Sequence, residues 1–88
     1  MEAQMIKSIR EALGLNQLQF AQLLGVHPIT VSKWERGVTS PTDYQGAFMS
    51  QFQAAAKNKI VRDELKNVLI AAGVIAALVL LFQAASKK

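Results

Sequence analysis

The C-terminal half of this sequence contains an apolar segment that is too long to lie exposed to water. Residues 68–82 read VLIAAGVIAALVLLF, 15 residues without a polar side chain. As a single helix, the segment would be apolar on every side, so we expect it to be buried in a membrane or in an oligomer. The residues before it mix charged and apolar side chains in the ordinary way. The sequence therefore predicts two parts of different character.

Chain length and composition exclude most catalytic chemistry. The chain has 88 residues, no cysteine and one histidine, His27. Disulfides, cysteine-ligated zinc, paired-histidine metal sites and most histidine-based triads are therefore excluded. The adjacent carboxylates Asp63 and Glu64 point in different directions on a helix, so we expect a solvated face there and not an acid/base pair. We predict that the protein is not an enzyme and needs no cofactor or metal.

The net charge favours a polyanionic partner. The formal charge is +4 and the isoelectric point about 9.8. The excess is +1 over residues 1–42 and +3 over residues 43–88. Charge alone therefore leaves both nucleic acid and anionic lipid open as partners.

Three short helices are predicted in the first part of the chain. Apolar residues at three- and four-residue spacing predict a helix from Met5 to Leu13. Asn16 is a suitable N-cap for a second helix over residues 17–24, and Pro28 is well placed at the start of a third that runs to about Arg36. A glycine follows each segment: Gly14, Gly25 and Gly37. Two short helices joined by a glycine-containing turn are typical of a helix-turn-helix.

The same periodicity predicts a core and a fourth helix. The residues expected inside are Phe20, Ala21, Leu24, Val31 and Trp34, and His27 is expected to cap the third helix. After Pro41, Thr42 or Asp43 can cap a fourth helix. Its expected core residues are Tyr44, Ala47, Phe48 and Phe52.

Several motifs in register resemble a known family. They are IREALGLNQ at 9–17, FAQLLGV at 20–26, TVSKWERG at 30–37 and Ser40-Pro41. Together they resemble the Cro/CI (XRE-type) helix-turn-helix repressors over about residues 3–45, whereas the C-terminal tail has no counterpart. The resemblance implies an all-α, lambda-repressor-like domain of four to five helices, here followed by a C-terminal apolar helix, in a protein of bacterial or phage type.

The resemblance also implies which residues bind DNA. They are Gln17, Pro28, Ile29, Thr30, Ser32, Lys33, Arg36, Thr39 and Ser40. Gln17 is expected to meet the DNA backbone and brace the third helix, and Lys33 is the best candidate for a guanine contact. Arg10 and Glu35 match positions that form a structural ion pair. The apolar pair Pro28-Ile29 departs from the family pattern, where hydrogen-bonding side chains are common.

The tail allows two interpretations. We divide the chain into a DNA-binding domain (1–53), a basic polar connector helix (54–67) and an apolar C-terminal helix (68–88); whether residues 43–85 form one continuous helix is left open. In the first interpretation the apolar helix is a membrane anchor, with the connector's lysines and arginine on the cytoplasmic side and Lys87-Lys88 just beyond its far end. In the second it mediates assembly. The residues expected in the membrane or the oligomer are Val68, Ala72, Gly73, Ile75, Ala76, Ala77, Val79 and Phe82, and an assembly seam would also include Leu65.

The sequence thus predicts a DNA-binding transcription regulator. We expect a repressor that acts as a homodimer on a pseudo-palindromic operator, in the cytoplasm or tethered to the inner face of the cytoplasmic membrane. The expected partners are double-stranded DNA, a second copy or a higher oligomer, and, for a tethered form, the lipid bilayer. The alternative is a membrane or assembly protein that uses its helix-turn-helix as a protein-interaction module.

Overall fold

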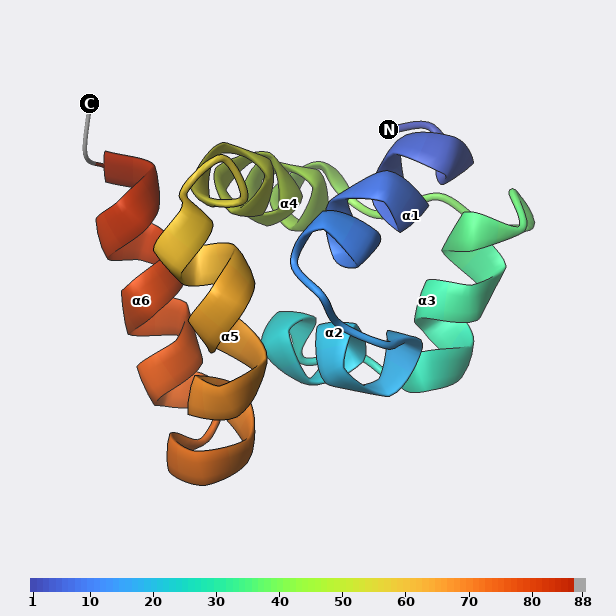
Figure 1. The fold of residues 1–88 in the computed structure, drawn as a ribbon. Helices are drawn as coiled ribbons and strands as arrows, with labels where there is room; N and C mark the ends of the chain where they lie inside the picture. Colours follow the sequence, from blue (N-terminus) through green and yellow to red (C-terminus); the bar gives the residue numbers. More distant parts are fainter. Residues whose placement is uncertain (87–88) are drawn as a thin grey trace.

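Six α-helices make up the fold in a computed structural model, which describes residues 1–86 (Figure 1). They are α1 (Ala3–Ala12), α2 (Gln17–Leu24), α3 (Pro28–Glu35), α4 (Asp43–Ala55), α5 (Lys59–Ala72) and α6 (Val74–Ser86). No strand occurs within residues 1–86, so the predicted all-α class is confirmed. Lys87 and Lys88, predicted to flank the tail, lie outside the described residues.

Local caps set the ends of the short N-terminal helices. At the start of α2, the Asn16 side chain accepts a hydrogen bond from the Gln19 backbone N–H at 2.8 Å, and the Gln19 side chain accepts one from the Asn16 N–H at 3.0 Å. Gly25 ends α2 in the left-handed conformation, with a φ of 67°. The His27 Nδ1 atom accepts a hydrogen bond from the Ile29 N–H at 3.1 Å and so caps α3. Each cap pairs a backbone group that a helix end leaves without a partner.

One core runs through all six helices. Ile6 of α1, Phe20 of α2, Val31 of α3, Phe52 of α4 and Leu81 of α6 are all at most 1% exposed. Trp34 is also buried, as the sequence predicted. Aromatic rings of Phe48, Phe52 and Phe82 lie 5.6–6.3 Å apart between centroids and join α4 to α6. The C-terminal helix therefore completes the same core as the N-terminal half.

Helix α4 buries a different face from the one we predicted. Thr42 caps it as expected: its hydroxyl accepts from the Gln45 N–H at 3.1 Å. The buried residues are Met49, Phe52 and Ala55, whereas Tyr44 is 73% exposed. The prediction that Tyr44 and Ala47 close the core is therefore wrong, because the neighbouring helices cover the C-terminal half of α4 and leave its first turn in solvent.

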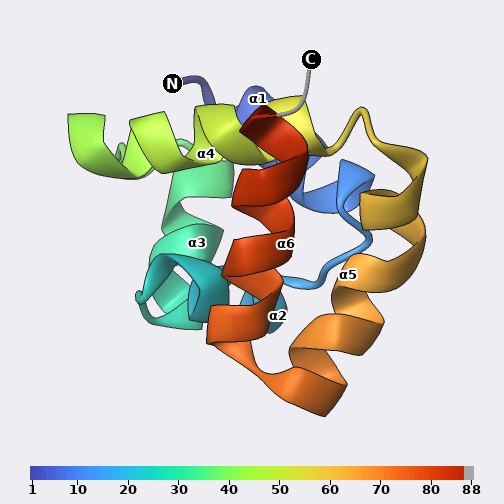
Figure 2. The same ribbon diagram turned by 90° about the vertical axis from the view of Figure 1, so that its left-hand side faces the viewer.

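The C-terminal half of the chain is divided at two points. Residues 56–58 end α4, and the Asn58 side chain caps α5 by accepting from the Ile60 N–H at 2.8 Å. Gly73 separates α5 from α6 with a φ of 93° and a ψ of −179°, a conformation that is essentially restricted to glycine. Helices α5 and α6 therefore form a hairpin, and its second helix, α6, packs against α4 (Figure 2). The predicted boundaries of a connector over 54–67 and one apolar helix over 68–88 do not match this division.

The apolar tail packs against its own chain, which corrects the expectation that only a membrane or an oligomer could bury it. Ala77 and Leu81 of α6 are fully buried, and Val68 and Phe82 are half-buried against the core. The continuous seam through Leu65 and Val79 cannot form, because Gly73 places its two halves on different helices. Within residues 1–86, every helix is too short or too polar to cross a membrane.

Candidate nucleic-acid interface

Helices α2 and α3 form a compact pair joined by a three-residue turn. Both helices have eight residues. After the left-handed Gly25, the Val26 N–H donates to the Ala21 carbonyl at 3.1 Å, so the turn stays tied to the end of α2. Pro28 then starts α3, where its missing N–H leaves nothing unpaired. The local sequence thus fixes the direction in which α3 leaves α2.

Helix α3 has one buried face and one exposed face. Val31 and Trp34 point into the core, with exposed fractions of 0% and 2%. On the outer side Ile29, Lys33 and Arg36 are exposed, and the other predicted DNA-binding residues of this helix are half-buried: Pro28, Thr30 and Ser32. The outer face therefore presents Ile29 and Lys33, and Arg36 at its end, to solvent.

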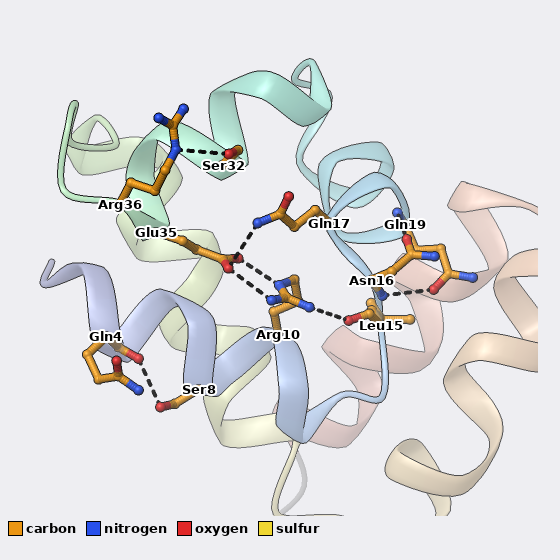
Figure 3. Close-up of polar contacts among 10 residues, drawn as sticks. All are labelled: Gln4, Ser8, Arg10, Leu15, Asn16, Gln17, Gln19, Ser32, Glu35 and Arg36. Atoms are coloured by element: carbon orange, nitrogen blue, oxygen red, sulfur yellow. Dashed lines mark hydrogen bonds and ion pairs between the residues drawn. The ribbon is translucent and has the colours of Figure 1, made fainter.

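An ion pair between α1 and α3 holds this face in place (Figure 3). The Arg10 Nε atom donates to Glu35 Oε2 at 2.7 Å, and Arg10 Nη2 donates to Glu35 Oε1 at 2.9 Å. A third bond runs from Arg10 Nη1 to the carbonyl of Leu15 at 3.0 Å. The arrangement is bidentate and nearly buried, with side-chain exposures of 13% and 5%. A bidentate ion pair is stronger than a single hydrogen bond, and it fixes the relative orientation of the two side chains.

The environment of this pair shifts the pKa values of both groups. Burial alone would raise the pKa of Glu35, but hydrogen bonds from Arg10 and Gln17 outweigh it, and the pKa lies below its ordinary value. The hydrogen bond to Glu35 raises the pKa of Arg10 above its already high ordinary value. Both groups are therefore charged at neutral pH.

Gln17 joins the start of α2 to the end of α3. Its side-chain Nε2 donates to Glu35 Oε1 at 3.2 Å, and the side chain is half-buried (Figure 3). Arg36, the residue directly after α3, donates from Nε to the Ser32 hydroxyl at 3.2 Å. The structure thus gathers Gln17, Ser32 and Arg36 around one end of α3.

The loop after α3 carries the last two predicted DNA-binding residues. The Val38 N–H donates to the Lys33 carbonyl at 2.9 Å, and Gly37 has a φ of 74°, which together end the helix. Thr39 and Ser40 follow and are exposed. They are free of the core and lie directly after the outer face of α3 in the chain.

One contact and one charge effect at this site were not predicted. The Leu15 carbonyl accepts a hydrogen bond from Arg10, and the charge of Lys7 helps to lower the pKa of Glu35. The amino-acid type at position 15 does not reveal that its backbone carbonyl accepts a hydrogen bond. Lys7 could have been found, since it lies one helical turn before Arg10 on α1. The predicted tail residues, by contrast, belong to the hairpin and not to this site.

Comparison with protein families matches this region. Residues 6–44 match the family model described as Helix-turn-helix. Residues 6–44 are a helix-turn-helix domain of the Cro/CI (XRE) type. The match spans most of α1, all of α2 and α3, and the start of α4, and it supports a DNA-binding transcription regulator of this type.

The helix-turn-helix domain is the matched part of the chain, and the family match stops before most of α4 and before the hairpin of α5 and α6. Neither the comparison with curated proteins nor the comparison with solved structures gives a match. The family therefore accounts for the candidate interface, and the role of the hairpin has to be argued from its own residues.

Proposed function

We propose that this protein is a repressor that binds a pseudo-palindromic operator as a homodimer, with half-sites about one helical turn apart. The observation that carries the proposal is the exposed outer face of α3, held by the Arg10–Glu35 pair while its inner face lies in the core. A rigid helix of this kind fits the major groove of B-DNA.

In the proposed complex, each residue of the interface contacts a base or the DNA backbone. Lys33 donates to guanine O6 and N7, and Thr30 and Ser32 supply further hydrogen bonds to bases or phosphates. Ile29, 56% exposed, and Pro28 contact a thymine methyl group. The phosphate contacts come from Gln17, Arg36, Thr39 and Ser40. Since Lys33 is the one side chain assigned hydrogen bonds to a base alone, one copy discriminates weakly between sequences.

The short length of α3 supports dimeric binding. Eight residues make a helix about 12 Å long, which covers few base pairs. Specific protein–DNA interfaces bury about 1,000–2,500 Å² of protein surface, and single small modules fall at or below the lower end. A second copy on a symmetric half-site doubles the contact. Binding at such a site would block promoter access, and the protein would act in the cytoplasm, where the operator is.

The test is selection of binding sites from random duplexes, followed by fluorescence anisotropy at two or more salt concentrations. We expect an enriched sequence with two-fold symmetry. Lys33→Ala should weaken binding by about 1–3 kcal/mol and relax selectivity at one position of each half-site. Lys66→Ala is the matched control, because Lys66 is an exposed lysine on α5, away from the interface.

Two results would contradict the proposal. If selection enriches no sequence at moderate salt, sequence-specific binding is contradicted, because only non-specific attraction to the phosphates would remain. Equal DNA affinity for the wild type and a Gln17→Ala/Lys33→Ala double variant would leave the proposed interface without a role, and would favour the use of the helix-turn-helix as a protein-interaction module.

A further inference from the structure

An open hollow of about 300 Å³ lies where α1, the end of α4 and the start of α5 meet. Its apolar lining comes from Ile9 and Ala12 of α1 and from Ala56, the residue directly after α4. Small-molecule sites in proteins commonly have volumes of about 300–1,000 Å³ and a mainly apolar lining. The hollow is therefore large enough for a small organic molecule.

Two cationic side chains line the hollow, and none of its lining residues within 1–86 is acidic. The cations are Lys57, between α4 and α5, and Arg62, in the first turn of α5. The two ion pairs within residues 1–86 use neither of them. We call this site the basic hollow. A negatively charged ligand finds two cations there that no carboxylate of the described chain neutralises.

The neutral polar residues of the basic hollow narrow the class of ligand. The Ser8 hydroxyl already donates to the Gln4 carbonyl at 2.9 Å, so Gln53 is the neutral side chain that can donate to a ligand. Two cations and an amide donor beside an apolar wall suit a carboxylate that is attached to a hydrocarbon body. An inorganic anion would leave the apolar wall uncovered, and a neutral molecule would leave the cations unpaired.

The basic hollow is separate from the DNA interface. Ser8 and Ala12 both line it and, four residues apart, share one face of α1. Arg10 lies two residues from each of them and therefore points to the opposite side of α1, where it binds Glu35. A ligand in the hollow would thus leave the outer face of α3 uncovered.

We propose that the basic hollow binds a small organic anion. Its carboxylate pairs with Lys57 and Arg62, and its hydrocarbon body packs against Ile9 and Ala12. Charge-assisted hydrogen bonds to the carboxylate orient the ligand, and removal of its apolar part from water adds affinity. The inference goes beyond the proposed function, because this site needs neither DNA nor a second copy of the chain.

The test is titration of the full chain with small carboxylates, followed by amide NMR spectra. The probes are benzoate, cyclohexanecarboxylate and adipate at millimolar concentrations. We expect at least one of them to shift the amide resonances of Ile9, Ala12, Ala56 and Lys57 until they saturate. Benzamide, the neutral analogue of benzoate, and inorganic phosphate, which has no hydrocarbon body, should leave these resonances in place at equal ionic strength.

Three variants locate the binding. Lys57→Gln/Arg62→Gln should weaken it about tenfold, because both charged partners of the carboxylate are lost. Lys59→Gln/Lys66→Gln is the matched control: it removes the same charge from exposed residues of α5 that do not line the hollow, and binding should change little. Ala12→Leu, at an exposed position, should block the hollow while both cations remain.

Two results would overturn the proposal. The first is the absence of any shift with all three carboxylates. A lower thermal midpoint of Lys57→Gln/Arg62→Gln would then assign the cations to the negative ends of α1 and α4, and shifts caused by a short DNA duplex would assign them to phosphates. The second is equal binding by this variant and the matched control, because the cations of the hollow would then have no part in recognition.

Discussion

Removing Arg10 should destabilise the fold far more than removing a surface charge. Arg10→Ala deletes two hydrogen bonds to Glu35 and one to the Leu15 carbonyl. It leaves a carboxylate that is 5% exposed with Gln17 as its remaining partner. Breaking a buried pair by removing one member costs about 3–5 kcal/mol, whereas exposed pairs contribute about 0–1 kcal/mol. For a domain of this size, we expect Arg10→Ala to lower the free energy of unfolding by about 3 kcal/mol.

A double variant without either charge separates the contribution of the pair from the cost of an unpaired buried charge. Glu35→Leu together with Arg10→Met removes both charges and keeps apolar volume, so the double variant should lie much closer to the wild type than Arg10→Ala does. Urea denaturation followed by circular dichroism measures all variants, with Lys59→Ala as the control for an exposed ion pair. A loss below about 1 kcal/mol for Arg10→Ala would refute the assignment of this pair as the clamp between α1 and α3.

The pH dependence gives an independent check. The pKa of Glu35 is lower in the folded state than in the unfolded chain. The stabilisation is therefore complete above the unfolded-state pKa and is lost as the pH falls through the folded-state pKa. The difference in free energy of unfolding between the wild type and Arg10→Ala should decrease as the pH falls, because a protonated Glu35 carries no charge for Arg10 to neutralise. A constant difference from neutral pH down to pH values below the ordinary glutamate pKa would contradict this account.

Three further predictions concern the hairpin and the caps. Leu81→Ala should cost about 2–5 kcal/mol in urea denaturation, since Leu81 is fully buried; a negligible change would mean that α6 does not pack on its own chain in solution. Gly73→Ala should cost about 1–3 kcal/mol by thermal unfolding, and strain is the sole cause, because an added Cβ meets nothing within 4 Å. Thr42→Ala should cost about 1 kcal/mol through loss of its cap, and Thr42→Ser, which keeps the hydroxyl, should restore most of it.

The helix-turn-helix could be predicted because its signals are local. Asn16 and Thr42 cap helices through side chains three residues away from their partners, and apolar spacing identified the buried faces of Phe20 and Trp34. Residues that depend on which neighbour covers them could not be placed in the same way. Tyr44 follows the helical period of a core residue, yet no helix covers the first turn of α4.

The tail shows where hydropathy stops being informative. A glycine within an apolar run is compatible with a continuous helix, and the run of residues 68–82 gives no local sign of which side faces the core. That choice depends on packing against α4 and on the aromatic contacts of Phe82 with Phe48 and Phe52, which lie about 30 residues earlier in the chain. Sequence spacing alone does not reveal such distant contacts.

Gly73 also sets the overall length of the molecule. Residues 59–86 as one straight helix would be about 42 Å long, whereas each half of the hairpin is about 20 Å long and the folded chain extends 32 Å along its longest axis. A straight helix would therefore carry the apolar residues of α6 away from α4. A single backbone conformation thus keeps this segment within the globular core and prevents a projecting apolar rod.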